Sequence, residues 1–253
     1  MLTHPTYNRL VALGLNGMAK ALEEQSRLPD ISALDFEERL GLLVDRETTE
    51  RESRRLVTRL QFAGLRQTAV VEDIDLKTPR GLDKALFHKL AAGEWIARHH
   101  NLLIVGPTGV GKSWIACALG HKACRDNRSV LYQRLPRLFD NLALGRGDGR
   151  HERLIKNLGR VELLILDDWG LAPMTAERRR DLLEIMDDRH GRGSTIVTSQ
   201  LPVDHWHEII GDPTIADAVL DRLVHNAYRL TLKGESLRKA AARRHNLDVE
   251  TTT

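Results

Sequence analysis

A glycine-rich stretch in the middle of the chain carries the clearest chemistry. Gly106-Pro-Thr-Gly-Val-Gly-Lys112-Ser113 has the residue order of a phosphate-binding loop. Glycines let the backbone turn and approach phosphate oxygens, and N–H groups at a helix start point at the anion. The lysine reaches the β- and γ-phosphates, and the serine hydroxyl is a ligand for Mg²⁺. The predicted nucleotide-binding residues are Gly106, Pro107, Thr108, Gly109, Val110, Gly111, Lys112, Ser113 and Trp114.

A second candidate site lies where an apolar stretch ends in acids. Residues 163–166 are Leu-Leu-Ile-Leu, and Asp167 and Asp168 follow directly. A buried strand that delivers a carboxylate at its end is what a Mg²⁺–nucleotide site requires. We therefore expect Asp167 to bind the metal with Ser113, and Asp168 to polarise the attacking water. Taken alone, two such acids would indicate an ordinary turn, but behind a complete phosphate loop they indicate a metal site.

Two further candidate functional positions are supported by weaker sequence patterns. The stretch 193–200 ends in small polar residues, and the hydroxyl of Thr198 or Ser199 could sense the γ-phosphate, although a plain strand end fits the pattern as well. Arg222 stands near a helix end, just before the last β-rich stretch. It is a candidate arginine finger for the site of a neighbouring subunit. On the residues alone, an ordinary surface arginine is the simpler interpretation.

Elements of two kinds must position these side chains. A linker at 70–80 and a helical pattern at 84–100 lead into short β-rich stretches that alternate with further helical patterns. The β-rich stretches are 102–105, 130–133, 163–166, 195–198 and 228–232. This alternation is typical of βαβ units and predicts an α/β fold with a five-stranded, mainly parallel sheet. The phosphate loop and the two acids then meet at the carboxyl edge of the sheet, where ligands bind.

The first part of the chain predicts helices without strands. Apolar residues recur at helical spacing until Pro29 breaks the pattern. A second helical pattern covers residues 34–44, and a third runs through the charged residues 46–66. We therefore expect a small all-α N-terminal domain over residues 1–68 and the α/β domain over residues 69–253.

Basic residues gather in two regions, although the net charge is only +3. The stretch 46–66 mixes arginines with acids, which fits either a solvated helix face or a phosphate-binding helix. Residues 121–160 hold ten Lys or Arg against four acids and include 145–151, which we expect to be a flexible loop. Charge and adaptability suit contacts with the DNA backbone. The candidate DNA contacts are Arg54, Arg55, Arg59, Arg137, Arg146, Arg150 and Arg153.

Composition narrows the class of protein. The apolar stretches are too short to cross a bilayer, and the N-terminus lacks the pattern of a secretory signal. Cys117 and Cys124 fall two turns apart in one helical pattern, too far for a disulfide. These features favour a cytoplasmic protein without a membrane partner. Aromatic residues are only 4%, which argues against a protein that binds single strands by stacking.

Taken together, the motifs resemble the AAA+ ATPase family. Within that family the chain is similar to the branch that contains the helicase loader DnaC and the transposition helper IstB, and the IstB side is the closer. The specific motifs are the phosphate loop and the block Leu163-Leu-Ile-Leu-Asp-Asp-Trp-Gly170. Less specific matches lie at 13–18, 66–75, 198–200, 215–223 and 234–236.

The resemblance implies a role for each matching residue. Lys112 and Ser113 take the Walker A positions, and Asp167 takes the Walker B position. Asp168 stands where many AAA+ proteins have a catalytic glutamate, and this shorter acid implies slow hydrolysis. Ser199 matches the sensor I position, with Thr198 adjacent, and Arg222 matches the arginine finger. Arg238 is a weak sensor II candidate, because the sequence ends soon after it and we expect no full C-terminal lid.

The resemblance also implies partners. It points to an ATPase that uses ATP and Mg²⁺, binds ATP between subunits of a homo-oligomer, assembles on duplex DNA largely without sequence preference, and helps a transposase engage its target. The alternative within the family is a helicase loader that remodels a replicative helicase. A small-molecule kinase would use the same phosphate loop, but the paired acids and the candidate finger argue against it.

Overall fold

The computed structural model of the protein describes residues 5–237. Two compact units divide between Arg59 and Leu60, inside a long helix, whereas the sequence pattern places a domain border at 68/69. Each unit is described by itself below. None of the helices within the described residues is both long and apolar enough to cross a membrane.

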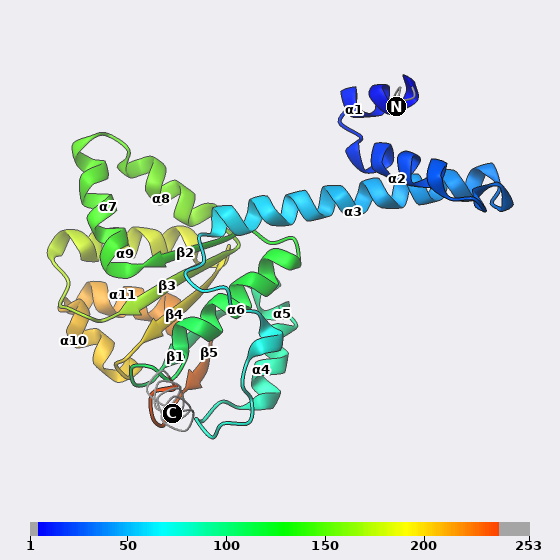
Figure 1. The fold of residues 1–253 in the computed structure, drawn as a ribbon. Helices are drawn as coiled ribbons and strands as arrows, with labels where there is room; N and C mark the ends of the chain where they lie inside the picture. The colour runs from blue at the N-terminus through cyan, green and yellow to red at the C-terminus, as the bar shows by residue number, and fades with distance from the viewer. Residues whose placement is uncertain (1–4, 238–253) are drawn as a thin grey trace, which may run out of the picture. The chain divides into compact units, whose positions relative to one another are not determined.

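The second unit contains a five-stranded parallel sheet in the order β2-β3-β4-β1-β5 (Figure 1). The strands are β1 (Asn101–Val105), β2 (Val130–Arg134), β3 (Leu163–Trp169), β4 (Ser194–Ser199) and β5 (Ala227–Thr231). All five predicted strands are confirmed. They are rich in Leu, Ile and Val because β1, β3 and β4 are buried on both faces.

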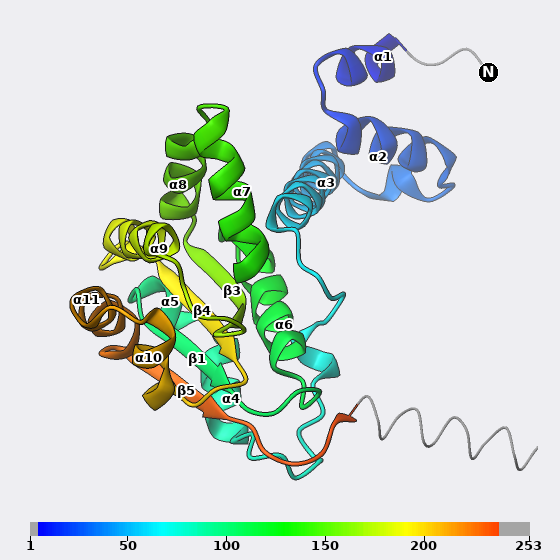
Figure 2. The same cartoon turned by 90° about the vertical axis from the view of Figure 1, so that its left-hand side faces the viewer.

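Helices cover both faces of this sheet. Figure 2 shows α6 (Lys112–Arg125) on one side of the strands and α9 (Ala176–Arg189) and α11 (Pro213–Val224) on the other. A buried apolar cluster joins the second face to α9, α11 and three more helices. These are α7 (Leu135–Gly147), α8 (His151–Arg160) and α10 (Trp206–Ile210), the last preceded by the short η3 (Val203–His205).

Strand alternation assigns the side chains of β3 and β4 to these two faces. Leu164, Leu166 and Val197 belong to the cluster with α9 and α11. Ile165 instead contacts α6, where a Cβ added at Gly120 would lie 2.8 Å from its Cδ1 atom. Residues that alternate with Leu164 and Leu166, including Asp167, therefore face α6.

Two helical predictions need correction in this unit. The expected helix at 84–100 is two helices, α4 (Lys84–Ala91) and α5 (Glu94–Ala97), because Gly93 between them has a φ of 79°. Four of the seven residues of the expected flexible loop at 145–151 are helical. Helix α7 continues to Gly147 and α8 begins at His151, so only a three-residue turn separates them. The linker after the first unit contains one short 3-10 helix, η2 (Val71–Asp73).

The first unit consists of helices, as predicted. They are α1 (Pro5–Ala12), α2 (Asn16–Arg27), the short η1 (Ile31–Ala33) and α3 (Phe36–Ala63), which extends past the end of the unit. Pro29 does follow the end of α2. The two helical patterns expected at 34–44 and 46–66 form the single helix α3. Asp45, the residue between them, is neither glycine nor proline and does not interrupt the helix.

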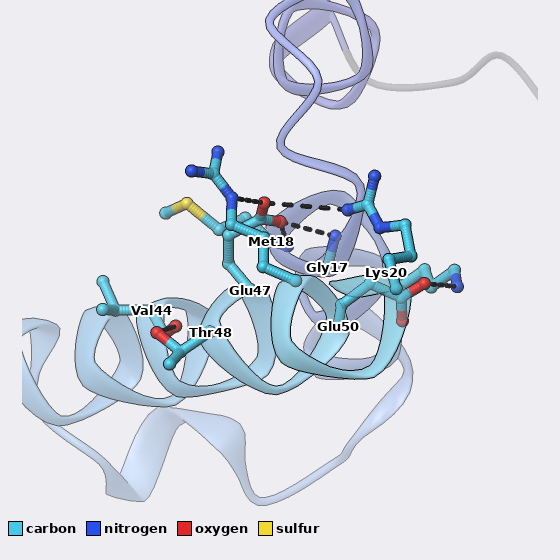
Figure 3. A network of polar contacts seen from close by, with 9 residues as sticks. Gly17, Met18, Lys20, Val44, Glu47, Thr48 and Glu50 are labelled. Carbon is cyan, nitrogen blue, oxygen red and sulfur yellow. Dashed lines mark hydrogen bonds and ion pairs between the residues drawn. The ribbon is translucent and has the colours of Figure 1, made fainter. Parts of the chain in front are cut away.

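A buried glutamate joins α2 to α3 (Figure 3). The Glu47 carboxylate accepts hydrogen bonds from the backbone N–H groups of Gly17 and Met18 at 2.7 and 3.2 Å. These groups belong to the first turn of α2, which has no side-chain cap of its own. The helices approach closely, because a Cβ at Gly17 would lie 2.6 Å from the Cα of Glu47. Glu47 therefore supplies from α3 the cap that α2 lacks.

Arginines complete this contact. Arg51 donates to Glu47 at 2.6 Å, and Arg54 lies 3.9 Å from the same oxygen. The hydrogen bond from Arg51 contributes most to holding the pKa of Glu47 below its ordinary value, and the bonds from the α2 backbone add to it. At least part of the arginine-rich pattern of α3 thus serves to keep one interhelical carboxylate charged.

Candidate nucleotide-binding site

The phosphate loop connects β1 to α6, as the motif requires. Gly106, Gly109 and Gly111 have φ values of 150°, 88° and 97°. Lys112 folds over the loop, and its Nζ donates to the carbonyls of Gly106 and Pro107, both at 2.8 Å. Lys112 and Ser113 are the first two residues of α6, so the N-terminus of this helix directly follows the loop.

Arg80, which the sequence analysis did not single out, buttresses this loop from the linker before α4. Its side chain is almost fully buried, and it donates to the carbonyls of Val110 and Asp75, both at 2.9 Å. A Cβ at Gly111 would lie 2.6 Å from Arg80 Nη1. Two features therefore favour glycine at this position, the contact with the buried Arg80 side chain and the positive φ. Arg80 is the single arginine of the linker at 70–80, and nothing in the local sequence pattern indicated its contact with the loop.

Asp167 is fully buried and lies at the centre of the site. Its Oδ1 accepts hydrogen bonds from Ser113 Oγ at 2.7 Å and from Thr198 Oγ1, and its Oδ2 accepts one from the hydroxyl of Tyr132. The structure therefore brings the phosphate-loop serine and the first acid together, as the sequence predicted. Tyr132, on β2, was missed.

The oxygens of this cluster suit Mg²⁺. Mg²⁺ takes oxygen ligands at about 2.1 Å in octahedral geometry, so adjacent ligands lie about 3 Å apart. Ser113 Oγ and Asp167 Oδ1 are 2.7 Å apart, close to that spacing. Both atoms are hard oxygen donors beside the loop that would hold phosphate. Ser113 and Asp167 are thus the residues that would hold the ion.

Asp168 has a different environment. Its backbone lies in the left-handed region with a φ of 65°, and its N–H donates to Thr198 Oγ1 at 3.3 Å. Its carboxylate is paired with Arg134, whose Nε and Nη2 both lie 2.8 Å from Oδ2. The hydrogen bond that Arg134 donates to Asp168 raises the pKa of Arg134. Arg134 is the last residue of β2, and the sequence analysis did not assign it a role.

The two sensor candidates point to opposite faces of β4. Thr198 contacts Asp167 and lies on the α6 face, where the phosphate loop is. Ser199 donates to the carbonyl of Trp169 at 3.0 Å and accepts from the N–H of Leu201 at 3.1 Å, so its hydroxyl closes a turn. The contacts favour Thr198 over Ser199 for the sensor position. Ser199 supports the loop through its carbonyl, which accepts from Gly106 N at 3.1 Å.

Arg222 lies at the other edge of the sheet. Its carbonyl accepts a hydrogen bond at 2.9 Å from Asn101, the first residue of β1, whereas the phosphate loop follows the last residue of that strand. Four steps along a strand span about 13 Å. Its guanidinium pairs with Asp187 of α9 and donates to the carbonyl of Ala218 at 2.7 Å. The structure does not bring Arg222 to its own chain's phosphate loop.

Two of the predicted DNA contacts, Arg146 and Arg150, form ion pairs within the protein. Arg146 pairs with Asp181, which is almost fully buried and also lies 3.0 Å from His151 Nε2. Removing one partner of such a pair leaves a buried charge unpaired, so Arg146 has a structural role. Arg150 is engaged by Asp148 at the α7–α8 turn.

The other candidates are exposed to varying degrees. Arg55, Arg137 and Arg153 have exposed side chains, and Arg59 is half-buried. Arg54 lies near Glu47, as described above. Trp114 in the first turn of α6 and Thr108 in the phosphate loop are exposed, and Thr108 donates to Gln200 at 2.7 Å. The sensor II candidate Arg238 falls outside the described residues.

Comparison with known proteins agrees with this site. Residues 8–245 match the family described as IstB-like ATP binding protein. The insertion sequence ATP-binding protein y4pL of Sinorhizobium fredii is 62% identical over 244 residues, covering 96% of this chain and 100% of that protein. The ATP-binding protein of insertion sequence IS21 from Pseudomonas aeruginosa is 33% identical over 246 residues, covering 97% of this chain and 92% of that protein.

Solved structures share the fold. DnaI matches with a TM-score of 0.58 and 22% identity, over 66% of this chain and 92% of that chain. The DnaC helicase loader matches with a TM-score of 0.56 and 18% identity, over 65% of this chain and 97% of that chain. Identities this low show the fold alone, and they confirm the predicted AAA+ architecture. The chain therefore belongs to the family of IstB-like ATP-binding proteins, P-loop ATPases with the AAA+ fold.

Proposed function

We propose that this protein binds ATP with Mg²⁺, assembles on duplex DNA in that state, and assists a transposase. Lys112 and the loop amides hold the phosphates, Ser113 and Asp167 hold the metal, and Asp168 orients water. The bound ion supplies positive charge against the phosphate oxygens. Support for the biological setting comes from the relatives, whose names describe ATP-binding proteins of insertion sequences.

The position of Arg222 carries the proposal of a shared site. A strand length separates this residue from its own phosphate loop, so it can act on a γ-phosphate only in another subunit. Its present partner Asp187 is exposed, and an ion pair of this kind contributes little, so the guanidinium can leave it. ATP would then lie between subunits, and the nucleotide state would control assembly.

Duplex DNA is the proposed surface for assembly. Arg55, Arg137 and Arg153 are the exposed candidates for which the described residues show no acid partner, and the last two lie on α7 and α8. Binding through such residues follows the phosphate backbone and carries little sequence information. The helicase-loader alternative has in its favour only the shared fold with DnaI and DnaC.

Mixing two inactive variants tests the shared site. Lys112→Ala should lose nucleotide binding, and Arg222→Ala should bind ATP but hydrolyse it at least tenfold more slowly. In a mixture, an Arg222→Ala subunit supplies an intact loop and a Lys112→Ala subunit supplies an intact arginine. Phosphate release should therefore partly recover in the mixture, measured with duplex DNA present.

Two results would contradict this arrangement. Normal hydrolysis by Arg222→Ala alone would remove the arginine from the reaction. Failure of the mixture to recover, with both variants folded and co-assembled, would exclude a site shared between subunits. Electron microscopy with duplex DNA and ATP or ADP would report the assembly itself, which we expect only with ATP.

A further inference from the structure

The two carboxylate oxygens of Asp167 accept hydrogen bonds from different sides of the site, and Tyr132 is the donor to one of them. Two hydroxyls donate to Asp167 Oδ1: that of Ser113, at the end of the phosphate loop, and that of Thr198, on β4. The phenol of Tyr132 donates to the other oxygen, Oδ2. One oxygen of Asp167 is thus directed to the proposed metal position, while the second is tied to the neighbouring strand.

The tie is rigid. Tyr132 is 8% exposed and sits on β2, whose backbone pairs in parallel with β3 throughout the segment that ends at Asp167. A tyrosine has two side-chain torsions, so a buried ring on a paired strand fixes the position of its hydroxyl. Arg66, on the segment after α3, lies beside the same phenol and opposes the effect of burial on its pKa.

A fully buried carboxylate needs donors on both oxygens. Metal binding would use the Oδ1 side, where Ser113 is itself a proposed ligand. Tyr132 is then the donor that does not belong to the metal set and can remain in place when the ion binds. Partners that hydrogen-bond a ligating carboxylate orient it and tune its affinity, and their loss costs typically 10–100-fold in metal affinity.

We propose that Tyr132 is a positioning residue that orients Asp167 for the magnesium ion of the nucleotide site. The proposal rests on the proposed role of Asp167. It gives a function in metal binding to β2, which lies at one edge of the sheet. The sequence pattern had assigned no functional role to any residue of this strand.

Substitution of the hydroxyl tests the proposal. Tyr132→Phe keeps the ring and removes only the donor. We expect the affinity for Mn²⁺ in the presence of ADP, measured by electron paramagnetic resonance, to fall about 10–100-fold. Affinity for ADP in the presence of a chelator should not change. Tyr228→Phe, on β5 away from Asp167, is the matched control and should leave Mn²⁺ affinity unaltered.

Further results and variants distinguish a positioning role of Tyr132 from a packing role and test the role of Asp167 itself. Unchanged Mn²⁺ affinity in Tyr132→Phe, with a lower melting temperature, would overturn the proposal and leave a packing role. If Tyr132→Phe does not fold, Tyr132→His, which keeps a ring with an N–H donor, must bind Mn²⁺ more tightly than Tyr132→Ala, and equal affinities would overturn it. Asp167→Asn should lose Mn²⁺ binding, and if it does not, the role of Asp167 itself is wrong.

Discussion

Asp167 and Asp168 are neighbours in the chain, but they contact different groups. Asp167 accepts three hydroxyl donors in a fully buried site, which suits a fixed metal ligand. Asp168 is partly exposed, paired with Arg134, and held at a φ of 65°. Its carboxylate is therefore close to water and can exchange partners, which suits a group that orients the attacking molecule.

The left-handed backbone at Asp168 allows a clean substitution. Asparagine tolerates positive φ and has the same shape, so Asp168→Asn should keep the fold and the affinity for ATP. Without the carboxylate, hydrolysis should fall about 100-fold or more, as for loss of a general base. Steady-state phosphate release checks the rate, and fluorescent ATP binding checks the affinity. A variant that hydrolyses at the normal rate would remove Asp168 from the reaction.

Thr198 and Ser199 can be separated by paired variants. Thr198→Val keeps the shape but removes the hydroxyl beside Asp167, and we expect the hydrolysis rate to fall about 100-fold, as when a stabilising donor is lost. Ser199→Ala removes a turn contact and should lower the free energy of unfolding by about 1 kcal/mol with the rate kept within a few-fold. The opposite result, a slow Ser199→Ala with a normal Thr198→Val, would restore the sensor role to Ser199.

At the scale of single elements, the first turns of α2 and α11 are capped by groups of different origin. Helix α2 begins without a cap of its own, and Glu47 of α3 fills that role across the helix pair. At the other end of the chain, Asp212 caps the first turn of α11 through Ile215 N at 3.0 Å, which sets the start of the helix that carries Arg222. The cap of α11 directly precedes that helix in the sequence, whereas the cap of α2 comes from a distant segment.

The Glu47 cap depends on pH. Because its pKa is lowered in the folded chain, the charged carboxylate stabilises α2 above the ordinary value of 4.5, and this contribution is lost as the pH falls through the lowered pKa. In Glu47→Gln, amide exchange of Gly17 and Met18 should be faster at neutral pH. The difference between variant and parent should shrink on acidification. Equal exchange at neutral pH would show that the carboxylate does not cap α2.

At the scale of the whole molecule, one chain keeps the residues of the proposed reaction apart. The phosphate loop, the acids and Thr198 meet at one edge of the sheet, while Arg222 lies at the other. In the proposed mechanism a single copy lacks one charge at its phosphate loop, and we expect ATP hydrolysis to depend on assembly. The proposed assembly would contact DNA through the exposed basic residues on α7 and α8.

Salt titration tests that surface. Affinity for random duplexes should fall steeply as salt rises, because each neutralised phosphate contributes about −0.9 to the slope of log K against log salt. Substituting both Arg137 and Arg153 by alanine should reduce that slope by about 2. Arg98→Ala is the control, since Arg98 is exposed and lies outside both basic regions. A flat salt response of the parent protein would contradict backbone-directed binding.

The sequence by itself determined the sheet, the phosphate loop and the first acid. These rest on local patterns: apolar stretches of strand length, a glycine spacing that only a tight turn satisfies, and an acid at a strand end. They can be predicted because the residues that cause them are adjacent in the chain. The choice between Thr198 and Ser199 also depends on strand alternation, but it required knowing which face meets α6.

Only the tertiary structure decided the partners that come from distant segments. Tyr132 and Arg134 meet the two acids because β2 pairs with β3, and Arg80 reaches Val110 from the linker. Arg146 resembled a DNA contact until Asp181 was placed against it. A side chain's charge is evident from sequence, but the group that neutralises it is set by packing across many residues, and that determines whether the charge remains available for function.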